Sequence, residues 1–413
     1  MKIIDLTLKH IIIDIDIIPI YPKIADRNAD QKARFFNINH RTIFKITTDN
    51  GIVGYGDARC EAPSKSTVKH LIDRDPFDFI NADLNSGLMG ALYDAMGKYL
   101  EIPAYKLMGQ KIRDRVPVAA WTRPASPEDL AKEVQRAVEE GYMIFKIHTC
   151  AYYDVYEQTR AVEEVAPPGF KMHYDFNHNR PLAAVLRILQ ELEKSPVVGM
   201  IEDPLVLSDV EGWRLLREKT SLPLLMHVPQ LGGGQEIIRG CADAYMIGEG
   251  GIGSTLVRGF ATALANVSSV IQLTGGTLTK AMALHMGAVI PNVAHSTNLD
   301  DQYGEDVVKQ RIEVAGGSSP VPKGAGLGVE VDEDALARCA ANKPTVIPHT
   351  IGILHLPDGH KLYTRGFPNV ARLTGFPEGN IRGIRLDVWE DDGSDKFKQT
   401  LQRIDQQGPF MEK

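Results

Sequence analysis

Several features that mark other classes of protein are missing from this sequence of 413 residues. It has no run of basic residues and no aromatic stripe between basic ones, and its net charge of −7 argues against a nucleic-acid partner. No stretch reaches about 18 uninterrupted apolar residues, and Asp5, Lys9 and Asp14 break the Ile-rich start. We therefore expect neither a signal peptide nor a membrane helix. The composition, 43% hydrophobic and 24% charged, is that of an ordinary globular enzyme.

Cysteine is also scarce. The four cysteines are scattered without a CxxC pair: Cys60, Cys150, Cys241 and Cys339. This spacing excludes a disulfide framework or a zinc ribbon and predicts buried thiols in a reducing, cytoplasmic compartment.

The length predicts two to three domains. Residues 1–115 have the pattern of an α+β domain. Residues 42–48 alternate as a strand, Asp49-Asn50-Gly51 forms a turn signal, and apolar residues at helical spacing predict a helix over 87–100.

The rhythm changes at residue 116 to repeating βα units, which predict a parallel barrel over 116–342. We expect strands near 117–121, 143–148, 171–175, 198–202, 222–227, 243–247, 269–273 and 293–296. Helices are expected near 127–140, 154–165, 181–194, 209–219, 233–240, 254–265 and 277–287. Residues 343–413 predict a hairpin, 350–356 against 361–364, and a helix over 396–404, so we expect a β-rich C-terminal extension that serves as an arm or lid.

Three of the predicted barrel strands end in polar residues that can hold a cation or move a proton. Strand side chains alternate, so Lys146 and His148 share one face, as do His173, Asp175 and Asn177. Glu202 closes the next strand. If these faces look inward, a lysine, a histidine and two acids converge at the end of the barrel that carries chemistry.

Five stretches resemble the mandelate racemase and muconate lactonising branch of the enolase superfamily. They are TDNGIVGYGDA (48–58), GALYDAMGK (90–98), PAYKLMG (103–109), IEDP (201–204) and GLGVEVD (326–332). The resemblance covers about residues 1–342 and implies a capping domain over a modified (β/α)7β barrel. It also implies a divalent metal, usually magnesium, that stabilises the enediolate formed beside a substrate carboxylate, since hard cations prefer oxygen ligands.

Carried over to this sequence, the resemblance makes Asp175 the first metal ligand and Glu202 the second. The third acid is replaced by Val228. His227 adjoins it and would face the other way on a regular strand, unless a bulge turns it. Two carboxylates and a histidine would suit manganese or zinc better than magnesium. The alternative is that Asp175 and Glu202 are only ion-paired inside the barrel.

The acid and base groups depart from the family pattern. Where the family has Lys-x-Lys, this chain has Lys146 and His148. His148 or Lys146 is therefore the candidate catalytic residue that removes the proton, and His148 is otherwise a hydrogen-bonded wall residue. The Asp–His dyad of related racemases is replaced by Gly248 and Gln272, and Glu249 would face away on a regular strand. A two-base racemase is therefore disfavoured.

Asn177, Gln272, His295 and Tyr21 are the candidate substrate contacts. Tyr21 lies in residues 19–39, a segment that also holds Lys23, Arg27 and Lys32. These side chains are candidates for contact with an anionic or hydroxylated ligand, and the alternative is that the segment is a solvated loop. Three functions stay open. The first is a metal-dependent, dehydratase-like lyase that abstracts the proton next to the carboxylate of a hydroxy acid or acid sugar. The second is a divergent, catalytically inactive family member that acts as a binding or structural protein, and the third is an isomerase or racemase of the same family. The family also implies a small carboxylate substrate and assembly as a homo-oligomer.

Overall fold

The computed structural model describes residues 10–25, 40–177, 180–343, 349–375 and 381–413. Within them two compact units can be distinguished. One lies within Met1–Ala25, Ile38–Ala119 and Met246–Lys343, and the other within Asp26–Asn37, Ala120–Tyr245 and Pro344–Lys413. This division does not follow the predicted boundaries at 115 and 342, which stay a prediction. In the described part of the chain, no helix is both long and apolar enough to span a membrane.

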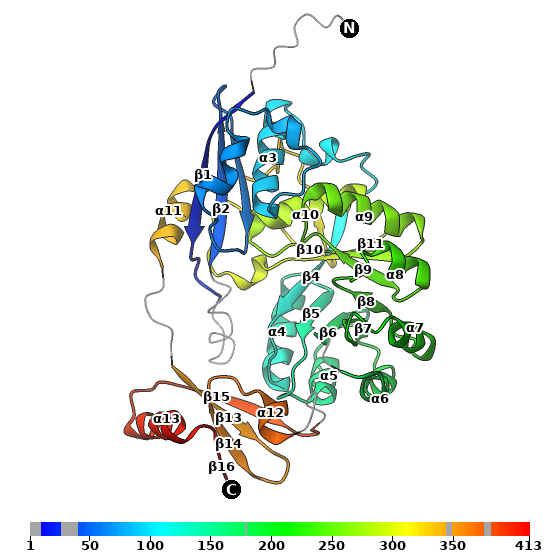
Figure 1. Cartoon of the computed structure of the whole chain (residues 1–413), viewed down its shortest axis with the longest axis vertical. Helices are drawn as coiled ribbons and strands as arrows, with labels where there is room; N and C mark the ends of the chain where they lie inside the picture. Colours follow the sequence, from blue (N-terminus) through cyan, green and yellow to red (C-terminus); the bar gives the residue numbers. More distant parts are fainter. Residues whose placement is uncertain (1–9, 26–39, 178–179, 344–348, 376–380) are drawn as a thin grey trace, which may run out of the picture. The chain divides into compact units, whose positions relative to one another are not determined.

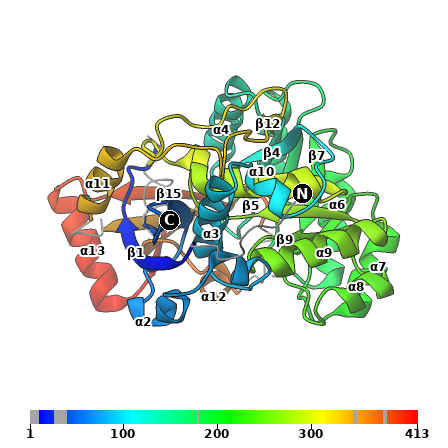
Figure 2. The same cartoon turned by 90° about the horizontal axis from the view of Figure 1, so that it is seen from above.

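The N-terminal part is an antiparallel sheet with a helix packed on it. Its strands are β1 (Ile12–Ile20), β2 (Arg41–Thr48) and β3 (Val53–Ala58), in that order, and short helix α2 (Lys65–Val68) precedes α3 (Ser86–Tyr99). The predicted hairpin turn is confirmed, with Gly51 at a positive φ of 81°. A Cβ on Gly54 or Gly56 would overlap the backbone of α3, so these glycines allow the helix to lie directly on β3. Figure 2 labels α3 beside β1 of the same sheet.

The central part is the expected barrel of eight parallel strands. They pair in chain order from β4 to β11, and β11 pairs back to β4 and closes the ring. The strands are β4 (Arg115–Thr122), β5 (Ile144–His148), β6 (Lys171–Asp175), β7 (Val198–Glu202), β8 (Leu224–Met226), β9 (Ala244–Ile247), β10 (Ser268–Gln272) and β11 (Val293–Thr297). The short strand β12 (Ser318–Pro320) pairs with β4 antiparallel.

Helices follow the barrel strands. They are α4 (Pro127–Glu139), α5 (Val155–Glu163), α6 (Leu182–Leu192), α7 (Val210–Lys219), α8 (Gly234–Arg239), α9 (Ile252–Leu264) and α10 (Thr277–Val289), and α11 (Glu333–Ala341) comes later. Helices α5, α6 and α7 lie outside strands β5 to β7 (Figure 1). The predicted order of strands and helices is confirmed, with β8 shorter than expected.

The C-terminal extension is a four-stranded antiparallel sheet in the order β15-β13-β14-β16. Its elements are β13 (Thr350–His355), β14 (Lys361–Arg365), α12 (Val370–Thr374), β15 (Arg385–Glu390), α13 (Asp395–Gln407) and β16 (Phe410–Glu412). The predicted hairpin is confirmed, with Leu354 opposite Leu362, and so is the predicted final helix.

Candidate active site at the ends of strands β5 to β8

A buried lysine lies between two carboxylates at the ends of three neighbouring strands. Lys146 of β5 is fully buried, and its Nζ lies 2.5 Å from Oε2 of Glu202 on β7 and 3.3 Å from Oδ2 of Asp175 on β6. The strand register explains the meeting, because Lys146 pairs with His173 and Asp175 pairs with Glu202. The predicted convergence of these side chains is therefore confirmed.

The charges in this cluster support each other. Burial alone would lower the pKa of Lys146, but the negative charges of Glu202 and Asp175 outweigh it and raise that pKa above its usual value. Burial likewise opposes ionisation of Glu202, yet Lys146 and the imidazoles of His173 and His227 hold its pKa well below the usual value. At neutral pH the cluster therefore contains an ammonium and an ionised Glu202.

His148 is held at the rim by an amide side chain. Its Nδ1 lies 2.9 Å from Oδ1 of Asn177 and 3.3 Å from Oδ2 of Asp175, and about a quarter of its side chain is exposed. Both neighbours of Nδ1 are acceptors, so Nδ1 carries the hydrogen and Nε2 keeps a lone pair. Burial is the main reason that the pKa of His148 is lowered, which keeps the imidazole neutral and able to accept a proton.

Asn177 is itself fixed by the backbone around Asp175. Its N–H donates to Oδ1 of Asp175 at 2.9 Å and its side-chain amide donates to the Asp175 carbonyl at 3.3 Å. Its φ is +54°, a left-handed conformation that asparagine tolerates better than most residues. Asn177 lies two residues beyond the end of β6, and its predicted contact with substrate stays a prediction.

A second cluster adjoins Glu202. Nδ1 of His227 lies 2.9 Å from Oε1 of Glu202, and the His227 N–H donates to Oδ1 of Asp203 at 2.9 Å. One ligand atom from each of Glu202, Asp203 and His227 falls within 4.8 Å of the others. Strand β8 ends at Met226, so the alternation that would have turned His227 away does not apply to it.

The donor set fits a divalent cation. Asp175, Glu202 and Asp203 are three buried carboxylates, while Lys146 is the ammonium among them. Burial, and then the neighbouring charge of Glu202, raise the pKa of Asp203 to about 8, so this carboxyl group keeps its proton at neutral pH unless a cation replaces it. Two carboxylates and one imidazole are ligands suited to manganese or zinc as well as magnesium. Asp175 lies outside the group of three, so its role as a ligand stays a prediction.

The remaining predicted residues lie in the other compact unit. Gln272 ends β10, and its Nε2 donates to Oε1 of Glu249 at 3.0 Å. Strand alternation does not apply to Glu249, because β9 ends at Ile247 and Gly248 takes a φ of 117°. His295 is buried on β11. Tyr21 is partly exposed and its backbone is bonded to Cys339 and Asn342.

The substrate roles of Gln272, His295 and Tyr21 stay predictions. Lys23 is described and its carbonyl accepts from the Gly304 N–H, whereas Arg27 and Lys32 lie outside the described residues. The sequence interpretation missed a role for Asp203. The available signal was a second acid directly after Glu202, but its left-handed φ of 46° could not be read from the letters.

Comparison with known proteins places this chain in a family. Residues 129–335 match the family described as "Enolase C-terminal domain-like", which covers half of the sequence. The chain therefore belongs to the mandelate racemase/muconate lactonizing enzyme family of the enolase superfamily, as predicted.

Named relatives within the family catalyse different reactions. A D-galactonate dehydratase from Variovorax paradoxus is 29% identical over 214 residues, which are 44% of this chain and 56% of that protein. An N-succinyl-L-Arg/Lys racemase from Bacillus cereus is 28% identical over 45% of this chain and 57% of its own length. This chain thus spans just over half of these curated relatives. The solved structure of an isomerase from Streptomyces coelicolor has a TM-score of 0.65 at 23% identity and covers 80% of this chain and 97% of its own.

Proposed function

We propose that the protein is a metal-dependent lyase that removes water from a hydroxylated carboxylic acid, such as an acid sugar. The observation that carries this proposal is the meeting of Lys146, Asp175 and Glu202 beside the neutral, partly exposed imidazole of His148. The dehydratase among the relatives supports the class of reaction. The donor atoms of the buried cluster support a cation, because Glu202, Asp203 and His227 each offer a ligand atom within 4.8 Å of the others.

His148 is the proposed base. Asn177 accepts the hydrogen of Nδ1, so Nε2 is the atom that takes the proton from the carbon next to the substrate carboxylate. The imidazolium then returns this proton to the hydroxyl that leaves from the β-carbon. The products are water and an enol, which tautomerises to the 2-keto-3-deoxy acid, and His148 ends neutral.

The other residues set the ionisation of the site and offer ligands for a cation. Lys146 keeps Glu202 ionised, and His227 and Asp203 complete a donor set with Glu202. A divalent cation at Glu202, Asp203 and His227 would supply the positive charge that stabilises a carboxylate while the adjacent carbon loses its proton.

Racemisation is the second candidate, because one relative is a racemase. A racemase needs a base on each face of the substrate. The two positions of the family dyad hold Gly248 and Gln272, and neither side chain is a base at neutral pH.

The test is a screen of acid sugars and N-succinyl amino acids in deuterated water with Mg²⁺ or Mn²⁺, followed by proton NMR. A lyase releases a 2-keto-3-deoxy acid, whereas a racemase exchanges the α-proton and retains every hydroxyl. His148→Gln should lower the rate by about 100-fold or more, because general bases contribute about that much. His355→Gln is the matched control, since His355 pairs with Asp387 in the extension at 2.8 Å. A wild-type rate in His148→Gln, or no substrate exchanging with any metal, refutes the proposal.

A further inference from the structure

The C-terminal extension has two different faces. Helix α13 covers one face of its sheet, where Phe397 and Ile404 pack with Ile351 of β13. Strand alternation directs Leu354, Leu362 and Leu386 to the opposite face. That second face needs its own apolar cover.

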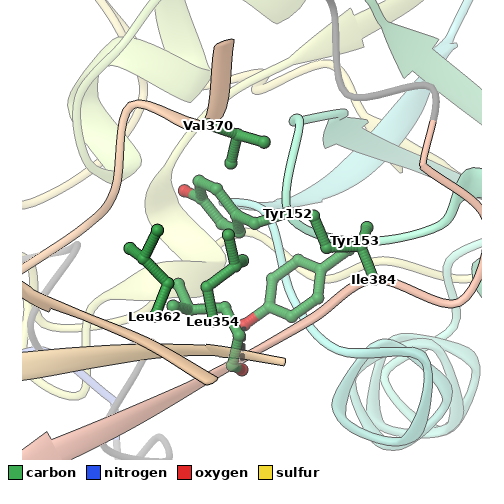
Figure 3. Packing of buried hydrophobic residues seen from close by; sticks show 7 residues of the cluster. Tyr152, Tyr153, Leu354, Leu362, Val370 and Ile384 are labelled. Atoms are coloured by element: carbon green, nitrogen blue, oxygen red, sulfur yellow. Dashed lines mark hydrogen bonds between the residues drawn. The ribbon is translucent and has the colours of Figure 1, made fainter. Parts of the chain in front are cut away.

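The cover is the loop that follows β5. Tyr152 and Tyr153 of this loop are 7% and 3% exposed and belong to one cluster with Leu354, Leu362 and Ile384 of the extension (Figure 3). Figure 3 shows both rings inserted among these aliphatic side chains. A buried aromatic side chain contributes a large contact area, so this is a firm attachment.

Polar contacts also join the loop to the extension. One carboxylate oxygen of Asp154 lies 2.8 Å from Nε of Arg382 and accepts from the Gly383 N–H at 3.1 Å. The other oxygen accepts from the Tyr156 N–H at 3.0 Å and caps helix α5. The hydroxyl of Tyr153 donates to the carbonyl of Leu386 at 3.3 Å.

The other end of this loop lies in the candidate active site. Thr149 directly follows His148, and its N–H and hydroxyl donate to the carbonyl of Asp175 at 2.8 and 3.1 Å. Five residues, 149–153, thus connect the imidazole of His148 with the carboxylate of Asp154.

The extension lies beyond the part of the chain that matches the family, because that match ends at residue 335. The Streptomyces coelicolor structure covers 80% of this chain, so a fifth of this chain has no counterpart in it.

We propose that the C-terminal extension is a positioning module for His148: it holds loop 149–154, and through this loop it fixes the imidazole against Asn177. The positioning residues are Tyr153 of the loop and Arg382 of the extension, whose contacts join the two segments. The inference rests on the proposed function only in that it takes His148 as the base.

The test uses the full-length protein with Arg382→Ala and Tyr153→Phe combined. This variant removes the ion pair and one hydroxyl but keeps the tyrosine ring in the cluster, so the fold is retained. Arg403→Ala is the matched control, because Arg403 lies in the same extension and pairs with Glu412 there. Arg382→Lys with Tyr153 intact keeps the positive charge and should behave as wild type.

The first readout is the ring NMR signal of His148 in protein carrying ¹³C-labelled histidine, assigned by its loss in His148→Gln. We expect this signal to shift or split in the double variant but not in Arg403→Ala, while the signal of buried His285 stays unchanged. The second is proton exchange, where we expect kcat to fall about 10-fold or more with KM nearly unchanged, because small misplacements of a catalytic group are costly.

An unchanged His148 signal in the double variant overturns the inference. So does a fall in kcat that Arg403→Ala reproduces. The ring signal requires no substrate, so it decides the inference even if the screen finds no activity and the proposed lyase function fails.

Discussion

The buried pair of Lys146 and Glu202 permits a quantitative prediction. Both side chains are fully buried at a nitrogen–oxygen distance of 2.5 Å. Removing one member of such a pair leaves an uncompensated buried charge, which costs about 3 to 5 kcal/mol. Glu202→Gln leaves Lys146 with Asp175 at 3.3 Å, so we expect the lower value, about 3 kcal/mol.

Lys146→Met should cost more, about 5 kcal/mol, because it leaves the carboxylates without their ammonium. The double variant has neither charge, so we expect it to lose about 3 kcal/mol less than the sum of the single losses. The assay is urea unfolding followed by tryptophan fluorescence in a buffer with a chelator, so that no divalent ion contributes. Additive losses would show that Lys146 and Glu202 do not interact and would refute the description of the cluster.

Three further outcomes are expected. Mn²⁺ at about 1,000 times its Kd should stabilise the wild type by about 4 kcal/mol and raise its melting temperature. Glu202→Gln should abolish this rise. An equal rise in the variant would show that Glu202 does not bind the metal. Asn177→Gly should keep the left-handed backbone and the stability but lose the hydrogen-bond acceptor for His148, so kcat should fall. Asn177→Ala should also lose about 1 kcal/mol of stability, because alanine is strained at a φ of +54°. Equal unfolding midpoints of the two variants would contradict this prediction. Burial lowers the pKa of His285 from 6.5 to about 4, so between these pH values the unfolded chain binds a proton that the folded chain excludes. The free energy of unfolding should therefore fall as the pH falls from 6.5 through 4, by about 3 kcal/mol in all. His285→Gln should show a smaller loss over this range in urea titrations, and an identical pH dependence would refute the assignment.

The sequence predicted the helices and strands that have a strong hydrophobic periodicity. Parallel barrel strands are short apolar runs, and alternation inside β5 and β6 places Lys146 and His148, then His173 and Asp175, on common faces. The contacts among these side chains confirm that interpretation. His285, predicted as a packed histidine of an apolar helix, is confirmed as well: Nδ1 accepts from the Tyr105 N–H and Nε2 donates to the Leu327 carbonyl.

Residues just beyond the strands could not be placed in this way. Alternation predicted that His227 and Glu249 would face away, but β8 ends at Met226 and β9 ends at Ile247. Their side-chain directions depend on loop dihedral angles, which vary from residue to residue and leave no period in the sequence. Asp203 is a similar case, because its direction depends on a φ of 46°.

The same difference between strands and loops applies to the candidate ligand set. The family's third acid would stand at Val228, which is 53% exposed, yet a carboxylate and an imidazole are still present beside Glu202. Both come from positions one residue past a strand, Asp203 after β7 and His227 after β8. A substitution there alters the donor set without disturbing strand pairing, since loop residues carry few of the barrel's hydrogen bonds. The strand residues Lys146, Asp175 and Glu202 thus carry the buried ion pairs, while the loop residues Asp203 and His227 complete the candidate donor set.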